Sequence, residues 1–271
     1  MTHRHPVKDR EREAVATAQA AGIRVYVNTG RSVPGALRAY EALGADSPVF
    51  CFNGAVVHDP TTGEDLVRHD LPETTLATAV QLAQESGAAL FAFVGDELIT
   101  HECDDPAFER LAELMARVGV QRRPTRADLP VNGVTKLWLV ASSAVATALK
   151  EATTGPETQW VRPDLGRIFK GLDRVLASAT AAPGMKRLSL EWLAERDGID
   201  LDEMVAVGDH DNDLEALHAA GLAVAVESSS PAVLAVADRV IGGPGTGGVA
   251  DLLLELARDD RTSPVRTNAP V

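Results

Sequence analysis

The sequence predicts an α/β protein in which a parallel, doubly wound sheet carries an inserted α+β domain. Towards both ends of the chain, short apolar runs that end in polar residues alternate with helix-forming segments, which is the pattern of strands buried in a parallel sheet. Between these parts the pattern changes to hairpin signals and amphipathic helices. At 271 residues and 45% hydrophobic content, the chain can bury a full core and is long enough for two domains.

We therefore expect a discontinuous core domain, an inserted domain and a disordered tail. The expected bounds are residues 1–68 and 177–258 for the core, 69–176 for the inserted α+β domain, and 259–271 for the polar, proline-containing tail. The core helices are expected over residues 9–21, 33–43, 186–196, 214–220, 231–237 and 249–257, and the core strands over residues 23–27, 48–52, 204–207 and 223–226.

The inserted domain is expected to have an antiparallel sheet. A hairpin signal at Gly95-Asp96 separates two of its strands. Its strands are expected over residues 89–94, 97–101 and 135–140, around Trp160 and over residues 174–177, and its helices over residues 72–86, 106–118 and 144–152. Trp138 and Trp160 are interpreted as packing residues, because large aromatic side chains usually serve the core.

Composition and charge exclude several classes of function. The net charge of -13 argues against nucleic acid and anionic membranes as partners, because both favour clustered Lys and Arg. Two cysteines provide neither a disulfide framework nor a zinc-binding pattern. No apolar run reaches the length of about 18 to 20 residues that a membrane span needs, and the polar start is no signal peptide. These features favour a soluble, cytoplasmic protein, and the net charge is compatible with a small anionic ligand held locally.

An acidic loop follows the apolar run of residues 204–207. Asp209, Asp211 and Asp213 fall within five residues at the expected carboxyl end of a parallel strand, where open α/β sheets bind ligands. At least two of these carboxylates can face one point, and oxygen ligands of this kind suit Mg²⁺ better than zinc. The alternative is a strand followed by an ordinary helix cap, which needs no metal.

Two other strand ends and one helix start carry candidate phosphate-binding groups. The strand of residues 23–27 leads to Asn28-Thr29-Gly30-Arg31, where a hydroxyl and backbone N–H groups can hold a phosphate. Asn53 follows the next strand. Lys186 stands at a helix start, where the helix dipole disfavours a cation. An ordinary polar turn at Thr29 and a solvated lysine at position 186 are the alternatives.

Together these signals resemble the haloacid dehalogenase superfamily of phosphohydrolases, specifically its Cof-like group with a large α+β cap (class IIB). The resemblance rests on Thr29, Asn53, Lys186 and the stretch Gly208-Asp209-His210-Asp211-Asn212-Asp213, in that order, and covers about residues 9–258. It implies a Rossmann-like parallel-sheet core with an inserted C2-type cap. The glycine-rich residues 242–248 lack the dinucleotide-binding pattern and are interpreted as a loop.

The resemblance also implies an activity. It suggests a Mg²⁺-dependent phosphatase of a small phosphorylated metabolite, a sugar phosphate or a phosphorylated cofactor, with a cap that closes over the site and selects the substrate. Asp213 would orient Lys186 or a metal-bound water. The residues that it assigns to phosphate are Thr29, Gly30, Asn53, Lys186 and Asn212, those that it assigns to Mg²⁺ are Asp209 and Asp213, and those that it assigns to catalysis are Lys186 and Asp213.

The family's nucleophile motif, Asp-x-Asp-Gly-Thr after the first strand, is absent from the sequence. Asp9, the earliest carboxylate, has no apolar strand before it and is no substitute. The leading hypothesis is a true start upstream of Met1. One alternative is a relic that binds a small anionic ligand without hydrolysis. The other is a repurposed site in which the strands ending at Thr29 and Asp209, which flank the first strand in the family's sheet, close up. Loss of this central strand is expected to leave unpaired sheet edges, which favour pairing with another chain in a homodimer.

Overall fold

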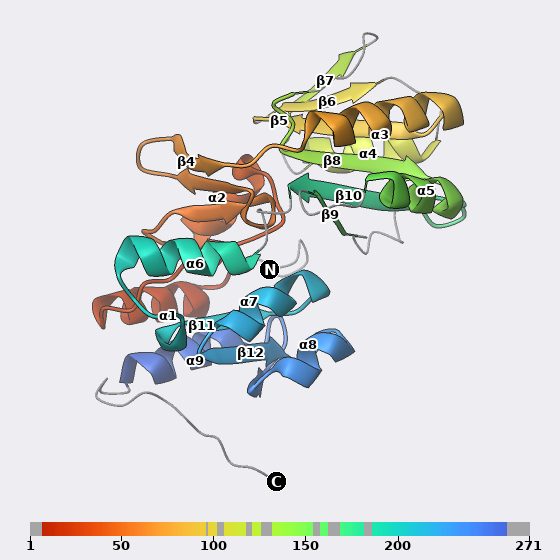
Figure 1. The fold of residues 1–271 in the computed structure, drawn as a ribbon. Helices are drawn as coiled ribbons and strands as arrows, with labels where there is room; N and C mark the ends of the chain where they lie inside the picture. Colours follow the sequence, from red (N-terminus) through yellow and green to blue (C-terminus); the bar gives the residue numbers. More distant parts are fainter. Residues whose placement is uncertain are drawn as a thin grey trace. The chain divides into compact units, whose positions relative to one another are not determined.

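The computed structural model describes residues 7–95, 97–101, 106–117, 121–125, 132–153, 158–161, 169–181 and 186–258 (Figure 1). These residues form two compact units. The first contains the described residues of Met1–Asn28, Leu37–Val49 and Lys186–Val271, and the second contains Thr29–Ala36 and the described residues of Phe50–Met185. The domain boundaries expected from the sequence stay a prediction, and the expected tail lies outside the described residues.

The first unit is built on a parallel sheet with the strand order β11-β12-β13. Its strands are β11 (Val205–Gly208), β12 (Leu222–Val226) and β13 (Arg239–Ile241), and its helices include α1 (Asp9–Ala20), α6 (Lys186–Asp197), α7 (Leu214–Ala219), α8 (Pro231–Val236) and α9 (Gly248–Arg258). Within the described part of the unit, α1 packs against α9 and α6 packs against α7 (Figure 1).

The side chains of β12 alternate between two small cores, which explains why the strand is apolar throughout. Ala223 and Ala225 pack with residues of α7 and α8. Val224 and Val226 pack with Ile241 and with residues of α9. Helices therefore cover both faces of this sheet, as the sequence pattern predicts for a doubly wound arrangement.

Strand β11 forms an edge of this sheet. Within the described part of the chain it pairs only with β12, in parallel. Two of its valines remain exposed, Val205 at 37% and Val207 at 42%, which is unusual for an apolar strand. The short strand β1 (Val27–Asn28) belongs to a different sheet. The alternative in which the two flanking strands close up is therefore wrong for this structure.

The predicted strand over residues 23–27 is mostly not a strand, because only Val27 of that range falls within β1. Arg24 and Tyr26 instead direct their side chains to Asp197 at the end of α6. Arg24 Nη1 lies 2.7 Å from the Asp197 carboxylate, and the Tyr26 hydroxyl donates a hydrogen bond to the same group. These two side-chain contacts hold the segment without the backbone hydrogen bonds of a strand.

The second unit contains a six-stranded sheet with the order β7-β6-β5-β8-β10-β9. Its strands are β5 (Ala89–Val94), β6 (Glu97–His101), β7 (Gln121–Thr125), β8 (Lys136–Ala141), β9 (Thr158–Val161) and β10 (Val175–Ala181), and its helices include α3 (Glu73–Ser86), α4 (Pro106–Arg117) and α5 (Ser143–Thr153). All pairs are antiparallel except β6 with β7. The expected antiparallel α+β module is present, and β7 is a strand that the sequence reading missed.

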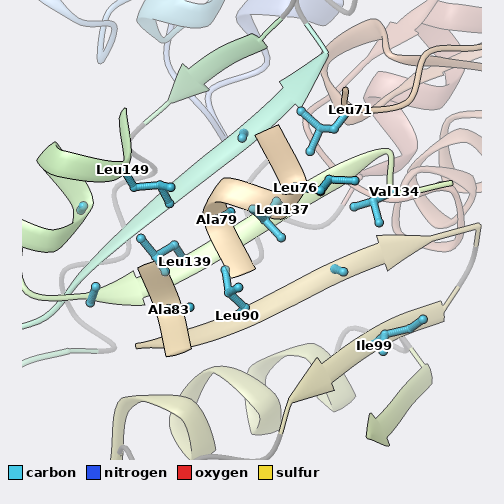
Figure 2. Packing of buried hydrophobic residues seen from close by; sticks show 14 residues of the cluster. Leu71, Leu76, Ala79, Ala83, Leu90, Ile99, Val134, Leu137, Leu139 and Leu149 are labelled. Carbon is cyan, nitrogen blue, oxygen red and sulfur yellow. The ribbon is translucent and has the colours of Figure 1, made fainter. Parts of the chain in front are cut away.

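The two faces of this sheet carry different helices. Leu90, Leu137 and Leu139 point to one face, where they pack with Leu76 of α3 and Leu149 of α5 (Figure 2). Their neighbours along the strands point to the other face, because successive strand residues alternate. There the ring of Phe91 stacks on that of Phe108 in α4, with centroids 5.1 Å apart.

A further sheet, with the strand order β1-β2-β3-β4, was not expected. It includes β2 (Val49–Cys51), β3 (Val56–Asp59) and β4 (Glu64–Arg68), of which β3 and β4 form an antiparallel hairpin. The sequence predicts no strand at β4, because its side chains are largely exposed and lack an apolar pattern. Helix α2 (Val33–Leu43) has the predicted bounds. Among the described residues, no helix is long and apolar enough to cross a membrane.

We expect Leu139→Ala to lower the free energy of unfolding by about 2–5 kcal/mol, because truncation leaves a cavity in the core of Figure 2. Leu139 is 0% exposed, whereas Leu66 in β4 is 44% exposed. The matched variant Leu66→Ala is therefore expected to change the unfolding free energy by no more than about 0.5 kcal/mol. Urea denaturation followed by circular dichroism measures both, and equal losses would contradict this account of the core.

Candidate functional site

The acidic loop after β11 is organised by a carboxylate that points inward. Asp213 is 4% exposed, and its Oδ2 accepts hydrogen bonds from the backbone N–H groups of Asp209 at 2.9 Å and His210 at 3.1 Å. The turn needs a glycine at position 208, because a Cβ there would lie 2.5 Å from the Asp213 Cβ. The side chain of Asp213 thus shapes the loop that carries Asp209.

Lys186, the first residue of α6, contacts the other oxygen of Asp213. Its Nζ donates a hydrogen bond to Asp213 Oδ1, and both side chains are nearly buried. Burial alone would raise the pKa of Asp213, but the ammonium of Lys186 and the two backbone N–H groups outweigh it and hold that pKa below its ordinary value. Asp213 is therefore ionised at neutral pH. The cation at this helix start is explained by its ion pair.

Asp209 differs from Asp213 in being accessible. Its side chain is 45% exposed and lies 3.1 Å from Nδ1 of His210. Asp211, also exposed, accepts a hydrogen bond from the Ser230 hydroxyl instead. Both oxygens of Asp213 are already engaged, which leaves Asp209 as the carboxylate best placed for a ligand.

The donor set fits Mg²⁺ in one specific way. The described residues contain no group of three His, Cys, Asp or Glu side chains that could hold a metal. Mg²⁺ does not require such a group, because it commonly binds through one or two carboxylates together with substrate phosphate and water. The carboxylate of Asp209 is sufficient for this mode of binding.

In the second unit, the loop after β1 is held against the end of β2. The N–H of Thr29 donates to the carbonyl of Phe50 at 2.9 Å, and the N–H of Asn53 donates to the carbonyl of Thr29 at 2.9 Å. A third backbone bond, 2.8 Å long, joins the N–H of Phe52 to the carbonyl of Arg31. The loop and the strand end are therefore one rigid piece of backbone.

The residues that follow β2 adopt strained conformations. Phe52 and Asn53 have φ values of 51° and 64°, in the left-handed region that is costly for side chains other than glycine. This conformation places the Asn53 side chain directly against Gly30, where an added Cβ would lie 2.8 Å from Asn53 Oδ1. Backbone strain of this kind clusters at functional sites. Gly30 and Asn53 are thus brought together, and their role in binding stays a prediction.

Lys136 lies against this loop but is not among the site residues predicted from the sequence. Lys136 begins β8, and its Nζ donates a hydrogen bond to the Gly30 carbonyl at 2.9 Å. The residue is 5% exposed, and burial lowers its pKa to about 8. The only signal in the sequence is a lysine at the start of an apolar strand, which is also the usual place for a solvated charge.

The predicted site residues fall into two groups. Thr29, Gly30 and Asn53 belong to one compact unit, whereas Lys186, Asp209, Asn212 and Asp213 belong to the other. Their joining into one site, and the role of each residue in it, stay predictions.

Comparisons with known proteins identify relatives along most of the chain. A model of the family of haloacid dehalogenase-like hydrolases matches residues 1–253. The chain is 27% identical over 253 residues to the pyridoxal phosphate phosphatase of Escherichia coli, with 89% of each chain covered.

Solved structures agree with this family match. A phosphatase of this superfamily from Bacteroides thetaiotaomicron has a TM-score of 0.77 at 20% identity, covering 94% of this chain and 90% of that one. A subclass IIB sugar phosphatase of the same superfamily has a TM-score of 0.73 at 17% identity, covering 92% of this chain and 91% of that one. These likenesses confirm the expected fold of an α/β core with a cap.

We expect Asp213→Ala to lower the free energy of unfolding by about 3–5 kcal/mol, because it leaves the ammonium of Lys186 nearly buried without a partner. Asp209→Ala removes a carboxylate from the same loop that is 45% exposed, and should cost no more than about 0.5 kcal/mol. Urea denaturation at neutral pH compares the two. Similar losses in both variants would show that the ion pair does not organise the loop.

The contribution of Asp213 should also depend on pH. Because its pKa is lowered on folding, the carboxylate stabilises the protein above its ordinary pKa, and this stability is lost as the pH falls through the folded value. The difference in unfolding free energy between the wild type and Asp213→Asn should therefore be constant at neutral pH and shrink below about pH 4. A constant difference down to the acid limit would contradict the lowered pKa.

Proposed function

Because the chain belongs to the family of haloacid dehalogenase-like hydrolases, we propose that it is a Mg²⁺-dependent phosphatase of a small phosphorylated metabolite. The observation that carries this proposal is the nearly buried Lys186–Asp213 ion pair beside the half-exposed carboxylate of Asp209, at the carboxyl end of a parallel strand. This arrangement provides a positioned cation and a metal-binding carboxylate in one loop, which are the groups that phosphoryl transfer requires.

Each group has a proposed task. Thr29 and Gly30 hold the substrate phosphate with a hydroxyl and backbone N–H groups, and Asn53 and Asn212 assist them. In the described part of the chain, the ammonium of Lys186 contacts Asp213 alone. Its other N–H groups are therefore proposed to hold phosphate oxygens, while the Asp213 carboxylate fixes its position.

Asp209 is proposed to hold Mg²⁺. When bound, the ion would polarise a phosphate oxygen and neutralise charge that develops during transfer. Asp213 contributes indirectly, because its hydrogen bonds to the N–H groups of Asp209 and His210 set the direction of the loop.

The relatives support the proposed class of substrate. Pyridoxal phosphate and sugar phosphates are the candidates that the names of similar proteins suggest. The α+β cap is proposed to exclude water during reaction and to choose among these substrates, since lids of this kind control access in many enzymes.

A second candidate function is ligand binding without hydrolysis. It is favoured by one observation, the absence of Asp-x-Asp-Gly-Thr from the sequence. A carboxylate nucleophile is the part of the chemistry that the remaining site residues do not supply.

One comparison separates these two functions. The 271-residue chain and a version preceded by an apolar strand ending in Asp-x-Asp-Gly-Thr are assayed for hydrolysis of p-nitrophenyl phosphate with Mg²⁺. We expect hydrolysis only in the extended version, at least about 100-fold above a control in which both Asp residues of the added motif are Asn. Hydrolysis by the shorter chain would mean that another carboxylate is the nucleophile. If neither version hydrolyses p-nitrophenyl phosphate or any ester of a wider panel of phosphate esters, the binding role would be favoured.

The phosphate and metal assignments are tested by binding, which needs no turnover. Lys186→Ala and Asp209→Ala are each expected to abolish Mg²⁺-dependent binding of orthovanadate, measured by isothermal titration calorimetry. Arg187→Ala is the matched control, because Arg187 neighbours Lys186 but is 54% exposed and pairs with Glu191. Unchanged vanadate affinity in both site variants would defeat the assignment.

A further inference from the structure

Lys136 places a positive charge underneath the loop that carries Thr29. It is the first residue of β8, and the neighbouring strands present Phe93 and Thr180 opposite it in the sheet. Its Nζ lies 5.4 Å from the centre of the Trp138 ring and 2.9 Å from the carbonyl oxygen of Gly30. At 5% exposure the side chain is almost fully removed from water.

This ammonium has no counter-ion among the described residues. Its one hydrogen-bond acceptor there is the uncharged Gly30 carbonyl, and no described carboxylate lies within ion-pair distance. Phe93 and Thr180 on the flanking strands are uncharged. An unpaired buried charge is costly. Burial alone lowers the pKa of Lys136, to about 8, so the group is still mostly protonated at neutral pH.

The charged groups near Lys136 are engaged elsewhere. Arg68 and Asp70 both bind the hydroxyl of Thr135, the residue before Lys136, at 2.7 and 2.9 Å. Arg31 follows Gly30 in the loop and is a further cation. The nearby carboxylate of Asp70 thus accepts from Thr135, and among the described residues no carboxylate pairs with the Lys136 ammonium.

A chain of hydrogen bonds links Lys136 to the hydroxyl of Thr29. The peptide group whose carbonyl accepts from Lys136 carries the N–H of Arg31 at its other end. This N–H donates to Thr29 Oγ1 at 3.3 Å. Because the hydroxyl oxygen accepts that bond, its own proton is available to donate to a ligand. Hydrogen bonds in series polarise one another, so the ammonium strengthens the peptide as a donor.

We infer that Lys136 is a positioning residue of the phosphate site, which fixes the Gly30–Arg31 peptide behind Thr29 and supplies a buried positive charge that favours a dianionic ligand at this loop. The inference rests on the proposed function, in which Thr29 binds phosphate. It differs from a purely structural role, in which Lys136 ties β8 to the loop by a hydrogen bond and its charge is irrelevant.

The test is a titration with tungstate, a tetrahedral dianion whose charge does not change between about pH 7 and pH 9.5. Affinity is measured by calorimetry for the wild type, Lys136→Met, Lys136→Arg and Thr29→Val. We expect Lys136→Met to bind about tenfold more weakly at pH 7. Its melting temperature should be unchanged or higher, because an unpaired buried charge is removed.

The pH profile distinguishes charge from structure. Wild-type affinity should decline as the pH rises above about 8, because Lys136 then loses its proton. The profile of Lys136→Met should lack this step, and Lys136→Arg should keep the affinity at high pH, since arginine stays charged. If Lys136→Arg does not fold, the pH profiles of tungstate affinity in the wild type and Lys136→Met are sufficient to separate the charge effect from a structural role.

Two outcomes would overturn the inference, and they differ from failure of the proposed function. Equal affinities and equal pH profiles in the wild type and Lys136→Met would leave Lys136 with no role in anion binding. If Lys136→Met binds tungstate more weakly at every pH and the wild-type affinity shows no pH step, the role of Lys136 would be structural only. Failure of the wild type to bind tungstate, or of Thr29→Val to weaken binding, would instead reject the phosphate site itself, and the inference with it.

Discussion

The nearly buried carboxylate of Asp213 is the constraint on which the acidic loop depends. A carboxylate removed from water must be compensated, and three groups compensate it: the ammonium of Lys186 and the N–H groups of Asp209 and His210. These bonds join the start of α6 to the end of β11. The same bonds leave Asp209 turned outward, so one structural requirement produces both the order of the loop and its accessible carboxylate.

Lys186 and Lys136, two described lysines that are nearly or fully removed from water, illustrate opposite solutions to the cost of burying a cation. Lys186 has a carboxylate partner within its own unit. Lys136 has only a peptide carbonyl among the described residues, and burial lowers its pKa to about 8. A site for phosphate esters is a place where an unneutralised cation is useful, because the ligand supplies the missing charge.

The edge strand β11 connects the fold to the chemistry. Its valines Val205 and Val207 are exposed, although strands of a parallel sheet are usually covered on both faces. The acidic loop with Asp209 and Asp213 follows this strand directly. The candidate metal-binding carboxylate is therefore carried by the edge strand of the sheet.

The sequence by itself determined the alternation of strands and helices, the α+β insertion and the order of Thr29, Asn53, Lys186 and Asp209. Local patterns carry this information, because periodicity and turn residues act over a few positions. The hairpin β3–β4 was missed, since its exposed second strand has no apolar period. Only the tertiary structure decided which carboxylate turns inward and that Lys136 reaches the Gly30 carbonyl. Both depend on burial and on contacts between residues distant in sequence, which no local pattern records.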